Sequence, residues 1–184
     1  KSTPWKYHRA RGPALGRTGP HGPNAPRSGR VVITAARESI GSMNFDEFTG
    51  TVQHRLELPG TGEAVRTTRA TLLTLGQRIP EGNAADLAAS LPIEIKWYPT
   101  GAVRKHGQRF DWQEFVARVS DIEGTEPQDA AYHAQVVMDL VASLVPPSDL
   151  QQLRDQLPEG EDEENWGKLF AVIDAGGWES TRSE

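Results

Sequence analysis

Cysteine is absent from the 184-residue sequence, and no apolar run approaches the length of a membrane span. The chain can therefore form neither disulfides nor a cysteine-ligated metal site, as is typical of proteins of the reducing cytoplasm. Its N-terminal segment is basic but lacks the hydrophobic stretch of a secretory signal peptide. We predict a cytoplasmic protein that does not associate with membranes.

Motifs for catalysis and metal binding are also missing. His54, His106 and His133 lie far apart in the sequence, and none belongs to a His-Glu-X-X-His pair. The segment from Gly60 to Gly62 lacks the Lys-Ser/Thr ending of a phosphate loop, so we interpret it as a turn before a helix. We expect no metal, no cofactor and no enzymatic activity. The alternative is an enzyme with an acid-lined pocket.

Lysine is scarce after residue 42, where only Lys96, Lys105 and Lys168 occur. Residues 1–42 hold eight Lys or Arg and one acid, a formal charge of +7, so the −5 of the whole chain leaves −12 for the remainder. Such an acidic, lysine-poor body would suit a high-salt cytoplasm, because salt screens the repulsion between like charges. An ordinary acidic domain is the alternative interpretation.

Residues 1–42 differ from the rest of the chain in composition. Their five prolines and six glycines leave too few apolar groups to offset the entropy of ordering, so we expect a disordered or extended arm. A flexible basic arm could follow nucleic-acid phosphates. The candidate contacts are Arg9, Arg11, Arg17, Arg27 and Arg30. Alternatively, the arm is a non-native leader, because Gly41 and Ser42 before Met43 resemble a cloning junction.

One pattern of helical spacing occurs twice between residues 43 and 170. The first copy comprises Asn44, Glu47, Phe48, Val52, Leu72, Leu75, Ile79, Leu87, Leu91 and Pro92. The second comprises Asp111, Glu114, Phe115, Val119, Val137, Leu140, Leu144, Leu153, Leu157 and Pro158. The apolar positions recur at helical period, so we predict an internal duplication of a three-helix unit.

Capping residues mark the expected helix starts. Asn44 and Asp111 each precede a Glu by three residues, the spacing at which side chains satisfy the free N–H groups of a first turn. We expect Thr125 to cap the second helix of the second copy, with Pro127 in its first turn. Ser148 is the expected cap of the helix that follows.

Five segments resemble a known family, the domain of unknown function 2267 of bacteria and archaea. They are residues 44–48, 72–75, 86–92, 110–115 and 151–158. The resemblance covers roughly residues 43–170 and implies a helical repeat domain. It implies no catalytic residues, and the arm lies outside it.

The predicted fold class is all-α, with two tandem three-helix units packed as one helical domain behind the arm. One unit alone buries too little surface to be a stable domain, so the two should share a core. We assign residues 1–42 to the arm, 43–98 to the first unit, 99–109 to a linker, 110–174 to the second unit and 175–184 to a tail. A further helix is expected at residues 165–174.

Aromatic side chains supply the candidate partner-binding residues Trp97, Tyr98, Trp112 and Trp166. Trp97, Tyr98 and Trp166 follow equivalent short helices and could frame a groove between the units; the alternative is that they close the core. Trp112 lies off the apolar stripe of its helix and Trp178 lies in a Gly-flanked tail, so we expect both to be at least partly exposed.

An acidic run of five Glu or Asp occupies residues 159–164, and a solvated loop is its simplest interpretation. The linker at 99–109 contains Arg104, Lys105, His106 and Arg109. Either this linker or the arm could lie against the acidic run.

These observations favour a non-enzymatic protein-binding or scaffolding module with an unknown protein partner. The alternative is an RNA- or DNA-associated protein that contacts phosphates through its arm. The two differ in salt dependence, because phosphate contacts weaken steeply as salt rises.

Overall fold

The structure, a computed structural model, describes residues 43–101, 107–158 and 165–181. All of them belong to one of the two units into which the chain divides, residues 32–184. The predicted arm lies outside the described residues. Within those residues the fold is all-α, as predicted. None of the described helices has both the length and the apolar character needed to cross a membrane.

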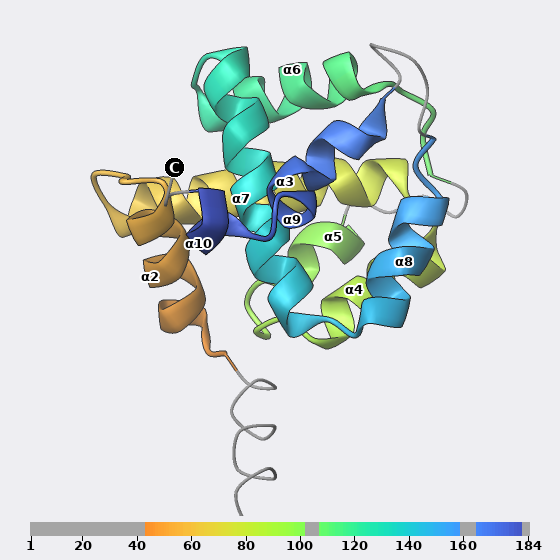
Figure 1. The fold of residues 1–184 in the computed structure, drawn as a ribbon, viewed down its shortest axis with the longest axis horizontal. Helices are drawn as coiled ribbons and strands as arrows, with labels where there is room; N and C mark the ends of the chain where they lie inside the picture. Colours follow the sequence, from red (N-terminus) through yellow and green to blue (C-terminus); the bar gives the residue numbers. More distant parts are fainter. Residues whose placement is uncertain (1–42, 102–106, 159–164, 182–184) are drawn as a thin grey trace, which may run out of the picture. The chain divides into compact units, whose positions relative to one another are not determined.

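The described chain forms two runs of longer helices, the first followed by the short α5 and the second by short helices at its C-terminal end (Figure 1). The longer helices are α2 (Phe45–Arg55), α3 (Thr61–Arg78), α4 (Glu81–Ala89), α6 (Trp112–Glu123), α7 (Pro127–Leu144) and α8 (Pro147–Asp155). The shorter ones are α5 (Trp97–Gly101), the 3₁₀ helix η2 (Trp166–Phe170), α9 (Ala171–Asp174) and α10 (Trp178–Thr181). The helix expected at 165–174 is thus a 3₁₀ segment followed by one α-turn, and α5 occupies the start of the predicted linker.

The longer helices recur in order and in length. Helices α2 and α6 have 11 and 12 residues, α3 and α7 have 18 each, and α4 and α8 have 9 each. Equivalent helices also meet, because α3 contacts α7 and α4 contacts α8. A duplicated three-helix unit remains our prediction for the origin of this pattern.

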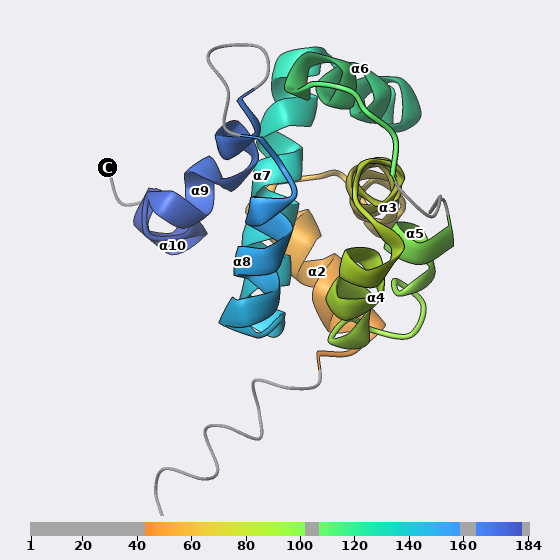
Figure 2. The ribbon, with the colours of Figure 1, turned by 90° about the vertical axis from the view of Figure 1, so that its right-hand side faces the viewer.

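Helix α3 lies at the centre of the core. It contacts α2, α5, α6 and α7, and Figure 2 looks along its axis with other helices on several sides. One hydrophobic cluster joins residues of both halves, from Phe48 in α2 to Phe170 in η2. The two halves therefore bury their apolar faces against each other rather than in separate cores.

The caps of α2 and α6 agree with the sequence. Asn44 Oδ1 accepts from the Glu47 N–H at 2.9 Å, and the Glu47 carboxylate accepts from the Asn44 N–H at 3.0 Å, a complete capping box. Asp111 Oδ1 accepts from the Glu114 N–H at 2.8 Å. Each such cap stabilises its helix by about 1 kcal/mol.

Two other predicted caps are wrong. Helix α7 begins after Glu126, without a side-chain cap, and the Thr125 carbonyl accepts from the Ser120 hydroxyl. Helix α8 begins at Pro147, after Pro146, which is one residue before the expected cap Ser148. Proline accounts for the earlier start, because its fixed φ suits a helix entrance and its missing N–H needs no partner there.

A glycine allows α3 to meet α5. A Cβ atom at Gly76 would overlap the carbonyl oxygen of Pro99 and lie 2.7 Å from the carbonyl carbon. The obstacle is backbone rather than a flexible side chain, so the two helices could not keep this contact with any larger residue.

We predict that Gly76→Ala destabilises the fold by at least about 2 kcal/mol, because the added methyl group overpacks the contact with Pro99. Chemical denaturation followed by circular dichroism measures the change. Gly50→Ala is the matched control, since Gly50 lies inside α2 with nothing within 4 Å of an added Cβ. That control should gain up to about 1 kcal/mol from its better helix propensity. Equal stability of the two variants would contradict the packing role of Gly76.

Candidate functional site

Two exposed apolar side chains mark the turns that lead into α5. Trp97 is 70% exposed and Ile93 is 67% exposed, whereas Leu91 and Ile95 between and beside them are buried. Tyr98 is partly buried and packs against the core. We call the exposed pair the Ile93–Trp97 patch. Of the four predicted partner-binding residues, Trp97 is therefore the one presented to solvent.

Trp112 and Trp166 close the core instead. Trp112 is only 6% exposed, so the expectation of partial exposure is wrong, and Trp166 is 1% exposed. The Trp166 ring contacts the rings of Phe110, Trp112 and Phe115 at centroid distances of 6.0, 6.1 and 5.2 Å. Tertiary packing from a segment some fifty residues away along the chain therefore covers Trp112. The predicted arm contacts Arg9, Arg11, Arg17, Arg27 and Arg30 lie outside the described residues.

A pocket of about 610 Å³ opens where the end of α3, the start of α6 and the end of α8 meet. Arg78 and Arg109 line it together with Asp111 and Trp166. Arg78 is held in place twice, because its Nε donates to the Phe110 carbonyl at 3.2 Å and its guanidinium lies 5.4 Å from the centre of the Trp166 ring. We call this cavity the Arg78–Arg109 pocket.

The backbone before α6 brings Arg109 to this pocket. The Gln108 N–H donates to the Gln77 carbonyl at 2.7 Å, which joins the segment to the end of α3. Gly107 has a φ of 65°, and a Cβ there would lie 3.0 Å from the Arg78 carbonyl carbon. A glycine is therefore required for this approach.

Two like charges meet in the Arg78–Arg109 pocket. Burial and the neighbouring Arg109 guanidinium lower the pKa of Arg78 below the ordinary value of an arginine. Arginine nevertheless stays protonated at neutral pH, so the repulsion persists. Among the described residues, neither arginine forms a salt bridge. The pocket thus concentrates positive charge on the surface of an acidic body.

Comparison with protein families identifies the chain. The model of the uncharacterized conserved protein family DUF2267 matches residues 45–163. The chain belongs to the DUF2267 family. The match confirms the resemblance found in the sequence and includes Trp97, Arg78 and Arg109, while Trp166 follows it.

The family description assigns this DUF2267 chain neither a reaction nor a ligand. No curated protein matches the chain. Its sites must therefore be inferred from its own side chains.

A buried polar cluster joins three helices of the DUF2267 chain. Glu123, at the end of α6, accepts from the Thr67 hydroxyl of α3 at 2.5 Å, and the same Glu123 oxygen pairs with His133 Nδ1 of α7 at 2.5 Å. The other Glu123 oxygen is buried without a hydrogen-bond partner in the part of the chain described. Through these contacts the cluster links α3, α6 and α7.

No group of three or more His, Asp or Glu is placed to hold a metal ion within residues 43–101, 107–158 and 165–181. His54 lies beside the Trp178 ring and His133 pairs with Glu123. His106 lies outside those ranges. The described histidines thus occupy separate environments.

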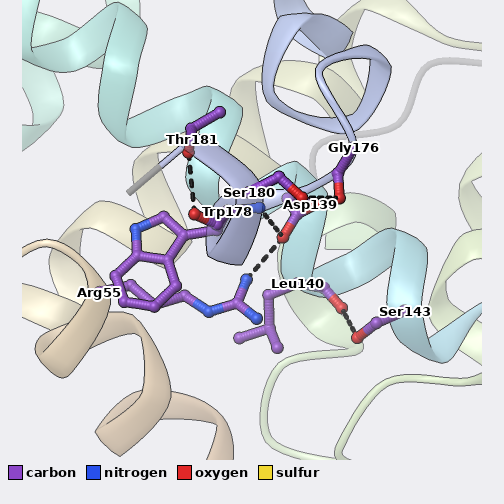
Figure 3. A network of polar contacts seen from close by, with 8 residues as sticks. All are labelled: Arg55, Asp139, Leu140, Ser143, Gly176, Trp178, Ser180 and Thr181. Atoms are coloured by element: carbon purple, nitrogen blue, oxygen red, sulfur yellow. Dashed lines mark hydrogen bonds and ion pairs between the residues drawn. The ribbon is translucent and has the colours of Figure 1, made fainter. Parts of the chain in front are cut away.

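Trp178 belongs to a second polar network, shown in Figure 3. It is 6% exposed, so the expectation of an exposed tail tryptophan is wrong. Asp139 of α7 accepts from Arg55 of α2 at 2.7 Å and from the Trp178 N–H at 3.3 Å. The Arg55 guanidinium lies 5.3 Å from the centre of the Trp178 ring. This network fastens the C-terminal segment to both halves of the fold.

Arg78 is the site residue that the sequence analysis missed. It stands in the last turn of α3, where a basic residue is ordinary because it complements the helix dipole. In the sequence, Arg109 is one of several cations of the predicted linker. Nothing in the local pattern shows that the two share a pocket.

We predict that Asp139→Ala destabilises the fold by about 3 kcal/mol, because it leaves Arg55 without its anion at a site where both side chains are only 14% exposed. Thermal and denaturant unfolding measure the loss. Asp174→Ala is the control, since Asp174 pairs with Arg154 but is 54% exposed. It should cost less than about 1 kcal/mol. If Asp174→Ala lost more stability than Asp139→Ala, the buried ion pair would not be the more important of the two.

Proposed function

We propose that this DUF2267 chain is a non-enzymatic protein-binding or scaffolding module that contacts its partner through the Ile93–Trp97 patch. The exposure of Trp97 is the observation that carries this proposal. The other tryptophans of the described residues, Trp112, Trp166 and Trp178, are all at least nine-tenths buried. A fold that can bury three large aromatic side chains leaves this one in water.

Exposed tryptophan fits the chemistry of binding hot spots. It removes a large apolar area from water when a partner covers it, and it loses little side-chain entropy because it has only two rotatable bonds. Ile93 extends the apolar surface by a second large side chain.

The surroundings of the patch indicate the character of the partner. Glu94 is exposed and Lys96 half-buried, so charged groups border the apolar pair. An apolar centre within a polar rim is the usual composition of a transient protein interface. We infer a partner that covers Ile93 and Trp97 with apolar side chains and meets the charged rim with polar groups.

Nucleic-acid binding through the basic arm is the alternative function. The formal charge of +7 on residues 1–42 supports it, and the −12 on the remainder makes the arm the main source of attraction to a nucleic acid. Deletion of residues 1–42 should then abolish nucleic-acid binding and leave protein binding unchanged.

We expect Trp97→Ala to weaken binding to the native partner by about 2 kcal/mol or more, because a central aromatic contact is lost. Affinity capture from native lysate with the intact chain first identifies proteins retained by the parent and lost by Trp97→Ala. Calorimetric titration with the purified partner then gives the affinity, and sedimentation of the chain alone tests whether the partner is a second copy.

Tyr132→Ala is the matched control, because Tyr132 is an exposed aromatic residue on α7, away from the patch in sequence. It should bind as the parent does. Equal binding by parent and Trp97→Ala, with both variants folded by circular dichroism, would reject the patch as the interface.

A further inference from the structure

The Arg78–Arg109 pocket holds two cations that no described acid neutralises by direct contact. Each guanidinium carries a full charge, and burial of Arg78 reduces the water that would screen it. Surface arginines normally gain from nearby carboxylates or from free hydration. Arg78 and Arg109 contact no described carboxylate, and Arg78 is partly removed from water, so the pair favours an anionic ligand.

The contacts of Arg78 define which of its atoms can bind. Its Nε donates to the Phe110 carbonyl, and its guanidinium carbon lies over the Trp166 ring, 5.4 Å from the ring centre. The two terminal nitrogens have no partner among the described residues. An arginine held at Nε and against a ring, with no other partner in the described part of the chain, loses little entropy when its two terminal nitrogens bind an oxyanion through parallel hydrogen bonds.

Asp111 is the acid that shares the pocket. Its Oδ1 accepts from the Glu114 N–H as the cap of α6, and it forms no salt bridge with either arginine. Attraction to the two arginines and repulsion from Asp111 both grow in proportion to the charge of the ligand. The lining carries one more positive than negative group, so its net attraction is about twice as large for a doubly charged anion as for chloride.

We propose that the Arg78–Arg109 pocket binds a doubly charged oxyanion, namely inorganic phosphate or the phosphate group of a phosphomonoester. The Trp166 ring is buried and offers no free face for a base or another aromatic group to stack on. Recognition is thus of the phosphate group itself. This site is independent of the protein-binding proposal, since it uses neither Ile93 nor Trp97.

Calorimetric titration of the full-length chain with potassium phosphate at pH 7.5, with ionic strength matched by chloride, tests the proposal. We expect saturable binding of one phosphate per chain. Arg109→Gln should weaken it at least about tenfold, because one charge-assisted contact is lost. Arg109 is exposed, so this variant should keep the fold.

Two further variants separate geometry from net charge. Arg78→Lys keeps the charge but loses the paired donors, so phosphate affinity should again fall about tenfold. Arg69→Gln removes an exposed arginine of α3 that does not line the pocket and should bind phosphate as the parent does. Equal weakening by Arg69→Gln and Arg109→Gln would show nonspecific charge attraction and overturn the site.

The source of the phosphate group is distinguished by titrating inorganic phosphate and phenyl phosphate separately. Tighter binding of the ester identifies a phosphomonoester as the ligand, and tighter binding of the free ion identifies phosphate itself. Failure of both to bind above matched chloride would overturn the proposal.

A last variant tests whether the chain's own carboxylates satisfy the arginines. Residues 159–164, directly after Pro158 in the sequence, contain Glu159, Glu161, Asp162, Glu163 and Glu164. If phosphate binds only after these five residues are changed to their amides, the chain's own carboxylates occupy the arginines. That result would overturn the proposal that the natural sequence binds an external phosphate group. The site is supported if the parent binds phosphate and the amide variant binds it less than about tenfold more tightly.

Discussion

The fold depends on burying helix α3 from several sides at once. Helices α2, α5, α6 and α7 all contact it, so its side chains must be small wherever a neighbouring backbone comes close. Gly76 meets Pro99 directly, and Thr67, Thr68, Thr71 and Thr74 are buried along the same helix. At these positions of α3 the side chains are small, even where they carry a polar hydroxyl group.

Those threonines bring hydroxyl groups into the core, and the structure satisfies them unequally. Thr68 donates to the Ala64 carbonyl and Thr67 donates to Glu123, whereas the buried hydroxyls of Thr71 and Thr74 have no partner within the described residues. A buried hydroxyl without a hydrogen bond costs about 1–3 kcal/mol. The close packing of α3 must offset this cost, which again places Gly76 and its neighbours at the centre of the stability of the fold.

Local features of this structure could be predicted from sequence, and distant contacts could not. The caps Asn44 and Asp111 act within three residues, so their spacing alone predicts them. The burial of Trp112 depends on Trp166, and that of Trp178 depends on Arg55 and Asp139, which lie in helices distant along the chain. Exposure is a property of the assembled core, so a side chain that lies off one helical stripe can still be enclosed by another element. For the same reason the sequence indicated Trp97 but not Arg78 as a site residue.

Both proposed binding surfaces depend on how α3 ends. Trp97 lies in the same five-residue helix as Pro99, which packs on Gly76, and Arg78 follows Gly76 by two residues. The Gln108 N–H that positions Arg109 is likewise bonded to Gln77 of this last turn. The close contact at Gly76 therefore fixes the backbone that carries both surfaces. As a result, Trp97 and Arg78 are held in position before a partner or ligand binds. Such preorganisation lowers the entropy lost on binding, which is how a small helical domain can recognise a partner or an anion through a few fixed side chains.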